Sequence, residues 1–342
     1  MKCGRSVLGL LALSASVIML LPASGRASEA QWVTYPGGAG PGAGRKVVLI
    51  AGDEEYRSEE AMPMLGKLLS VRHGFECVVL FSIDAETGAI DPEEQTNIPG
   101  LEALGDADLM VIATRFRELP DEQMKHIVDY VESGRPIVGL RTATHAFSYQ
   151  RNPDSPYAHW HFRSEEWPGG FGQQVLGDTW INHHGRHGQE STRGVVAPGA
   201  AEHPILRGVD DVWGPTDVYG LRNLGDDANV LLLGAVIAGM SSDDPPVEGP
   251  KNDPMVPIAW TRSYTGAGGK AARVFTTTMG ASTDFESEGL RRLLVNAVYW
   301  GLGMEDGIPE QSDARVVGEY APTDFGFGSQ TVGVMPSAHA LP

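Results

Sequence analysis

Polar residues directly follow a short apolar stretch near the middle of the chain, and they are the strongest candidates for chemistry. Residues 136–140 are typical of a short buried strand, and the next five, from Arg141 to His145, include a guanidinium, two hydroxyls and an imidazole. In open α/β sheets, ligands bind just beyond the carboxyl ends of the strands. The alternative is a capped helix start, with Thr142 or Thr144 as the N-cap and His145 packed inside.

Two further apolar stretches also end in charged residues. Residues 46–51 and 107–113 are predicted strands, and the side chains that follow them are Asp53, Glu54, Glu55 and Arg57 in one case and Arg115 and Arg117 in the other. Carboxyl ends of parallel strands meet at one sheet edge, so these groups should converge with residues 141–145. Charged loop tips are often merely solvated, but acids, arginines and a histidine on one edge favour a functional site.

The chemistry that these residue types support is acid/base catalysis. An imidazole can act as either acid or base near neutral pH, which makes His145 the candidate proton carrier. Arginines polarise a carbonyl or enediolate oxygen, the role expected of Arg115 and Arg141. The candidate catalytic residues are His145, Arg141, Thr142, Glu55, Asp217 and Tyr219.

An aromatic insert over residues 148–195 interrupts the strand and helix pattern. Loops this long in compact domains are usually functional, and aromatic faces beside polar groups suit sugar rings. The alternative is that the aromatic rings form a small core beneath the loop. The candidate substrate-binding residues are Asp53, Arg57, Arg115, Arg117, Trp160, Trp167, His183 and His184.

The histidines at the end of this insert also raise the question of a metal. His183, His184, His187 and Glu190 carry ligand atoms that divalent metals accept. Glycines at 185 and 188 break a helix, so His183 and His187 are not helical i,i+4 partners, and a tight structural site is disfavoured. A catalytic divalent ion stays open.

Composition and the N-terminus indicate an exported acidic protein. The formal net charge is −18, which repels phosphate backbones and argues against a nucleic-acid partner. Residues 7–21 are apolar, follow Lys2 and Arg5, and precede small residues, the pattern of a signal peptide over residues 1–27. We therefore expect a periplasmic or secreted protein with no membrane segment after cleavage. The aromatic insert indicates a sugar as its small-molecule partner.

Alternating apolar stretches and amphipathic helices predict one α/β domain over residues 46–304. Helices are expected over about 58–71, 121–133 and 286–302, with later strands at 228–235, 256–261 and 273–278. Residues 28–45 are expected to be a flexible lead-in. Residues 305–342 should be an extended tail that either trails or lies across the domain.

Several of these segments together resemble the ThuA-like (trehalose utilisation) family. The resemblance rests on residues 48–56, 139–147, 203–205, 216–219, 258–262 and 292–300, in order across residues 46–304. It implies a flavodoxin-like, class I glutamine amidotransferase-like fold, doubly wound with a mostly parallel sheet, and a link to disaccharide or keto-sugar catabolism. His145, Asp217 and Tyr219 match family positions. The family often has His-Ser where this chain has Arg141-Thr142, and Gly-His at 280–281, so a role that needs a second histidine is not carried over.

The amidotransferase relationship does not bring its thioester chemistry. Those enzymes carry a nucleophilic cysteine at the turn that residues 139–143 would occupy, and Arg141 stands in that place. A guanidinium is permanently protonated and cannot attack a carbonyl. We therefore expect an exported carbohydrate-processing enzyme, a hydrolase, lyase or isomerase acting on a disaccharide or keto-glycoside without a Cys nucleophile. The alternative is a non-catalytic sugar-binding or interaction module.

Overall fold

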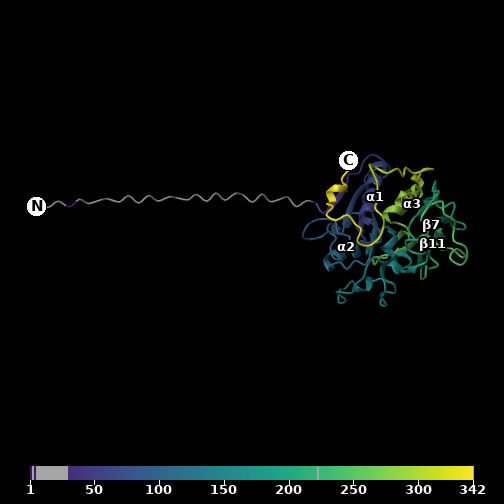
Figure 1. The fold of residues 1–342 in the computed structure, drawn as a ribbon, viewed down its shortest axis with the longest axis horizontal. Helices are drawn as coiled ribbons and strands as arrows, with labels where there is room; N and C mark the ends of the chain where they lie inside the picture. The colour runs from purple at the N-terminus through teal and green to yellow at the C-terminus, as the bar shows by residue number, and fades with distance from the viewer. Residues whose placement is uncertain (2–3, 5–29, 222, 342) are drawn as a thin grey trace.

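A ten-stranded mixed sheet runs through the described part of the chain (Figure 1). The computed structural model describes residues 1, 4, 30–221 and 223–341, so nearly all of the predicted signal peptide lies outside the described residues. The sheet order is β1-β3-β2-β4-β5-β12-β11-β10-β7-β8. Its strands are β1 (Trp32–Tyr35), β2 (Lys46–Gly52), β3 (Glu76–Phe81), β4 (Leu109–Thr114), β5 (Ile137–Leu140), β7 (Ser191–Val196), β8 (Trp213–Gly214), β10 (Asn229–Ile237), β11 (Val256–Thr265) and β12 (Ala271–Thr277).

The centre of the sheet is parallel, as predicted, and its flanks are antiparallel. Strands β3, β2, β4, β5 and β12 run parallel to one another. Strands β11, β10, β7 and β8 continue the sheet with antiparallel pairs. Parallel neighbours need a long crossover, whereas only residues 266–270 join β11 to β12, so that pair is a hairpin. The short Gly-rich connection was visible in the sequence.

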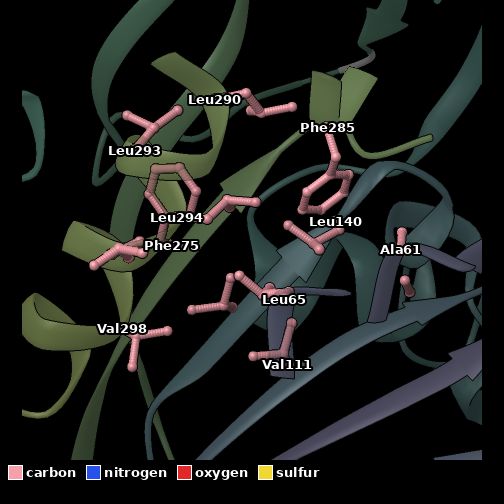
Figure 2. Packing of buried hydrophobic residues seen from close by; sticks show 14 of the residues in the cluster. Ala61, Leu65, Val111, Leu140, Phe275, Phe285, Leu290, Leu293, Leu294 and Val298 are labelled. Atoms are coloured by element: carbon pink, nitrogen blue, oxygen red, sulfur yellow. The ribbon is translucent and has the colours of Figure 1, made fainter. Parts of the chain in front are cut away.

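Helices cover both faces of the parallel strands. Residues alternate along β2, so Leu49 packs with α1 (Ser58–His73) and α3 (Glu288–Gly301), while Ile50 packs on the side of α2 (Asp121–Glu132). Figure 2 shows the first of these layers, in which leucines of α3 meet Phe275 of β12 and Leu140 of β5. These two apolar layers hold the carboxyl ends of β2, β4 and β5 at a fixed separation.

The structure corrects the expectation for the lead-in and decides between the two alternatives for the C-terminal tail. The lead-in predicted to be flexible contains β1, whose apolar residues pair antiparallel with β3 at the sheet edge. The tail after residue 305 lies across the domain rather than trailing. It is attached where Ile90 donates its backbone N–H to Val334 at 2.8 Å and where Tyr35 donates its hydroxyl to the carbonyl of His339 at 2.7 Å. In Figure 1 this yellow segment runs beside α1.

The described residues contain no helix that is both long enough and apolar enough to cross a bilayer. A second, two-stranded sheet pairs β6 (Trp180–His183) with β9 (Tyr219–Leu221). It brings the end of the aromatic insert next to the carboxyl ends of the parallel strands, because His183 pairs with Tyr219.

The imidazole of His339 makes attachment of the tail sensitive to acid. Burial, with Lys67 nearby, lowers its pKa to about 4, and its ring stacks on Phe81 with centroids 5.5 Å apart. The neutral ring therefore stabilises the folded state above the ordinary pKa of about 6.5, and this contribution is lost as the pH falls towards 4. We expect about 1 kcal/mol less stability from this residue at pH 5 than at pH 7, after allowing for partial solvent screening.

Urea unfolding of the wild type and of His339→Phe at pH 7 and pH 5 measures this contribution. The Phe ring preserves the stack but cannot be protonated, so the variant should lose less stability on acidification. An identical loss in both proteins would contradict the assignment to His339.

Candidate functional site

Five segments meet at the carboxyl ends of the parallel strands. Three follow β2, β4 and β5, as the sequence predicted, and two come from around β6 and β9. Residues 53–57 follow β2, residues 115–117 follow β4, and the 3-10 helix η2 (Arg141–His145) follows β5. The other contributors are residues 183–187 and 217–219.

The carboxylate of Asp217 is the hub of this site. One oxygen accepts hydrogen bonds from Arg141 at 3.0 Å and from His187 Nδ1 at 3.1 Å, and the other accepts from His183 Nδ1 at 2.7 Å. Its side chain is 0 % exposed. Burial alone would raise the pKa of this carboxyl, but the Arg141 charge and the two histidine hydrogen bonds outweigh it and hold the pKa well below its usual range. Asp217 is therefore an anion that orients two imidazoles.

Arg141 fixes the position of Asp217. Its guanidinium donates to the carbonyls of Asp217 at 2.7 Å and Thr278 at 2.8 Å and lies over the rings of Tyr56 and Tyr219, 4.4 and 3.7 Å from their centroids. The backbone of Arg141 is left-handed, with φ 44°, which is uncommon for a residue with a side chain. These hydrogen bonds show that Arg141 positions Asp217, and its role in polarising a substrate oxygen stays a prediction.

Glu55 and Arg115 lie beside this hub. Glu55 Oε1 is 3.3 Å from His187 Nε2, and Oε2 is 3.5 Å from Arg115 Nη2. Burial raises the pKa of Glu55, and the charge of Arg115 opposes the rise. Arg115 also pairs with Glu54 and stacks over Phe116 and Phe327. A carboxylate with a raised pKa next to a fixed cation is suited to accept and return a proton.

Asp53 and Thr142 hold this edge of the site in shape. One oxygen of Asp53 accepts the backbone N–H groups of Glu55 at 2.8 Å and Tyr56 at 2.9 Å, and the other accepts the hydroxyl of Thr142. Both residues are buried. These bonds turn the chain after β2 so that Glu55 faces the histidines. Thr142 is thus engaged with Asp53 and does not cap η2, and η2 has no side-chain cap.

His145 is near the site but enclosed by aromatic rings. The residue is 2 % exposed, and its ring centroid lies 5.1 Å from those of both Phe116 and Trp180. Nδ1 is 3.2 Å from the hydroxyl of Thr144. Burial, with Arg115 and Arg141 nearby, lowers the pKa of His145 well below its ordinary value, so the ring is neutral. The surroundings of His145 are those expected for a packed histidine. The role of His145 in proton transfer stays a prediction.

Other predicted binding residues lie elsewhere or have structural partners. Arg57 and Arg117 are fully buried, with Arg57 bonded to the tail carbonyl of Gly326 and Arg117 bonded to Glu54. Trp160 is buried and packs on Trp167, centroids 5.2 Å apart, in the apolar layer beside α2. No contact found among the described residues joins those two rings to the Asp217 hub.

The structure narrows the set of metal-ligand candidates. Donor atoms of His183, His187 and Asp217 all lie within 4.8 Å of one another. His184 instead donates to the carbonyl of Lys251 at 2.8 Å, and Glu190 pairs with Arg186 and Lys251. The three-residue group is thus the place where this site can hold a cation.

Three aromatic residues outside the predicted set, Trp180, Phe325 and Phe327, complete the site. Phe325 in the tail packs on Tyr56 and His187, with centroids 5.6 and 5.4 Å away, and Phe327 is 61 % exposed beside Arg115. The ring centroid of Trp180 lies 5.8 Å from that of His183. For Phe325 and Phe327, the signal available in the sequence was two Phe residues spaced by one glycine in a Pro- and Gly-rich tail.

One family model matches most of this chain, and several solved structures resemble it weakly. The family model described as "ThuA: Trehalose utilisation" matches residues 46–301. A ThuA-like protein from Bacteroides uniformis is 18 % identical, covering 78 % of this chain and 94 % of its own, with a TM-score of 0.47. A ThuA-like protein from Parabacteroides merdae is 16 % identical, covering 83 % and 95 %, with a TM-score of 0.48. A search of curated proteins finds no match.

Replacing Asp217 by Asn tests its place as the hub. The variant leaves the buried Arg141 cation without its countercharge, which should cost about 3–5 kcal/mol of unfolding free energy. The matched control is Asp227→Asn, which removes a surface pair with Arg262 at 2.9 Å and should cost less than about 1 kcal/mol. Urea unfolding measures both, and equal small losses would show that Asp217 does not hold the site together.

Proposed function

Since this chain belongs to the ThuA family, whose description is trehalose utilisation, we propose that it is an exported carbohydrate-processing enzyme. Its substrate would be an oxidised disaccharide or keto-glycoside, and its chemistry acid/base. The observation that carries the proposal is the placement of Glu55 between His187 and Arg115, at 3.3 and 3.5 Å. We further infer that the domain is of the doubly wound, flavodoxin-like type, supported by α1 and α3 on one face and α2 on the other.

Proton removal beside a carbonyl is the step that this arrangement favours. A carbon next to the keto group of a sugar is acidic, and a carboxylate with a raised pKa is a suitable base for it. In the proposed reaction Glu55 takes this proton, and Arg115 stabilises the negative oxygen of the resulting enediolate. The enediolate then either expels a glycosidic oxygen in the β position, which takes the proton held by Glu55, or moves its hydroxyl proton to the other oxygen and takes the proton of Glu55 on the former carbonyl carbon. The first outcome is a lyase reaction and the second an isomerisation.

Aromatic surfaces at the site suit a sugar ring. Phe327 is exposed beside Arg115, and Trp180 lies beside His183. The indole Nε1 of Trp180 has no hydrogen-bond partner among the described residues. C–H faces of a pyranose pack on such rings while its hydroxyls take polar contacts. In this proposal the sugar is recognised by tail and β6 residues rather than by Trp160 and Trp167.

Solvent-hydrogen exchange tests the proton transfer directly. When the wild type is incubated in D₂O with a 3-keto disaccharide, deuterium should appear on a sugar carbon next to the keto group. NMR measures the rate of this incorporation. Glu55→Gln should slow the exchange by roughly 10²–10⁴-fold, because it cannot accept the proton. Glu190→Gln is the control, since its carboxylate pairs with Arg186 and Lys251 outside the hub.

The same assay decides the part played by His145. A proton carrier at this position requires His145→Gln to slow exchange as much as Glu55→Gln does, with the fold intact by circular dichroism. A variant that unfolds, or that keeps near-full exchange, would assign His145 to packing alone. Saturable binding of the sugar with no exchange by the wild type would support the non-catalytic binding module instead.

Export is a separate part of the proposal and has its own test. The short apolar run of residues 7–21 and the small residues after it predict cleavage to a mature N-terminus at Ser28 or Gln31. N-terminal sequencing of protein recovered from the periplasm or medium should find one of these residues. Protein that still begins at Met1 would contradict processing.

A further inference from the structure

We propose that His183, His187 and Asp217 bind one divalent transition-metal ion, of the kind that accepts imidazole and carboxylate ligands, such as Zn²⁺. The metal would supply an electrophile for the carbonyl of the substrate, and in that respect the inference rests on the proposed function. Binding of the ion itself depends only on the arrangement of these three side chains.

The donor atoms are spaced for a shared ion. His183 Nδ1 and His187 Nδ1 lie 2.7 and 3.1 Å from the two oxygens of Asp217, and all donors are within 4.8 Å of one another. With metal–ligand bonds of about 2.0–2.2 Å, neighbouring donors of a tetrahedral ion are about 3.3 Å apart. The side chains of His183 and His187 are 33 % and 35 % exposed, so their rings have room to turn by the small amount required.

The surrounding contacts match those that support metal ligands elsewhere. A histidine that binds a metal through one ring nitrogen usually donates its other N–H to a carboxylate. With Nδ1 of His187 on the ion, Nε2 faces Glu55 Oε1 at 3.3 Å. The ligating carboxylate is likewise held, because Arg141 donates to Asp217 at 3.0 Å. Glu55 would thus hold the ring of His187 in place on the ion and lie close to a substrate oxygen bound to the ion.

Glycines that break a helix here are what allow the histidines to approach Asp217. A Cβ at Gly185 would stand 3.0 Å from the Cβ of Asp217. Gly188 has a φ of +66°, a backbone conformation that residues with side chains rarely adopt. The loop between the two histidines therefore folds closely over the carboxylate. This explains how His183 and His187 converge without the helical spacing that the sequence argument required of them.

The ligand set leaves room for substrate. Two imidazoles and one carboxylate are three protein ligands, the number found in catalytic zinc sites, where the remaining position takes water or substrate. The exposed sides of both histidines open this position to solvent. Arg141 compensates part of the charge of Asp217, so we expect an ion that chelators remove rather than one buried permanently.

Calorimetric titration of chelator-treated protein with Zn²⁺, without any sugar, tests the site. We expect one ion per chain and a loss of affinity of roughly 100-fold or more in His183→Ala and His187→Ala. His184→Ala is the matched control and should bind as the wild type does, because His184 is bonded to the carbonyl of Lys251. Co²⁺ absorption spectra report directly whether imidazole ligands are present.

Each outcome has a defined meaning. No binding by the wild type, or binding that His187→Ala leaves unchanged and His184→Ala removes, overturns the proposed site. Since the alanine variants also lose a hydrogen bond to Asp217, His187→Gln is measured in parallel. It should stay folded by circular dichroism and still lose affinity, and full affinity in that variant counts against the site. Stoichiometric binding without sugar turnover keeps the metal site and rejects the proposed reaction. Sugar turnover by a chain that binds no ion keeps the proposed reaction and rejects the metal site.

Discussion

The buried ion pair between Arg141 and Asp217 is the interaction on which the rest of the site depends. It joins the end of β5 to the segment before β9, 76 residues later in the chain, at 3.0 Å. Such a pair adds little net stability compared with apolar residues, because both charges lose their water, but breaking it is costly. Its value lies in geometry. Arg141 keeps Asp217 ionised and fixed, and Asp217 in turn orients His183 and His187.

The parts of this arrangement that follow from local order were predictable from the sequence. Parallel strands placed residues 53–57, 115–117 and 141–145 on one edge, and the family-model match agrees with the resemblance read from the motifs. The antiparallel flank was not predicted, although the five residues between β11 and β12 are too few for a parallel crossover. The short edge strand β1 was missed since a Gly-rich segment directly follows its four residues.

The roles of individual charged residues could not be read from residue type. Arginines at strand ends serve ligands in some proteins and buried carboxylates in others, and the sequence does not distinguish the two uses. Here Arg57 and Arg117 are covered completely, whereas Arg115 keeps part of its side chain in solvent. Burial of Arg57 depends on Gly326, which is 269 residues away. Only long-range packing separates these cases, and the same holds for His145.

The C-terminal tail completes the site. Gly326 donates its N–H to the carbonyl of Glu55 at 2.8 Å, so the tail is bonded to the chain beside the candidate base. Phe325 closes one side against Tyr56 and His187, and Phe327 presents an open ring beside Arg115. The polar groups thus face an apolar wall formed by the tail, while the side chains of His183 and His187 stay 33 % and 35 % exposed. Because an apolar neighbour lowers the local dielectric, the ring of Phe327 beside Arg115 strengthens the ion pair that this guanidinium makes with Glu55.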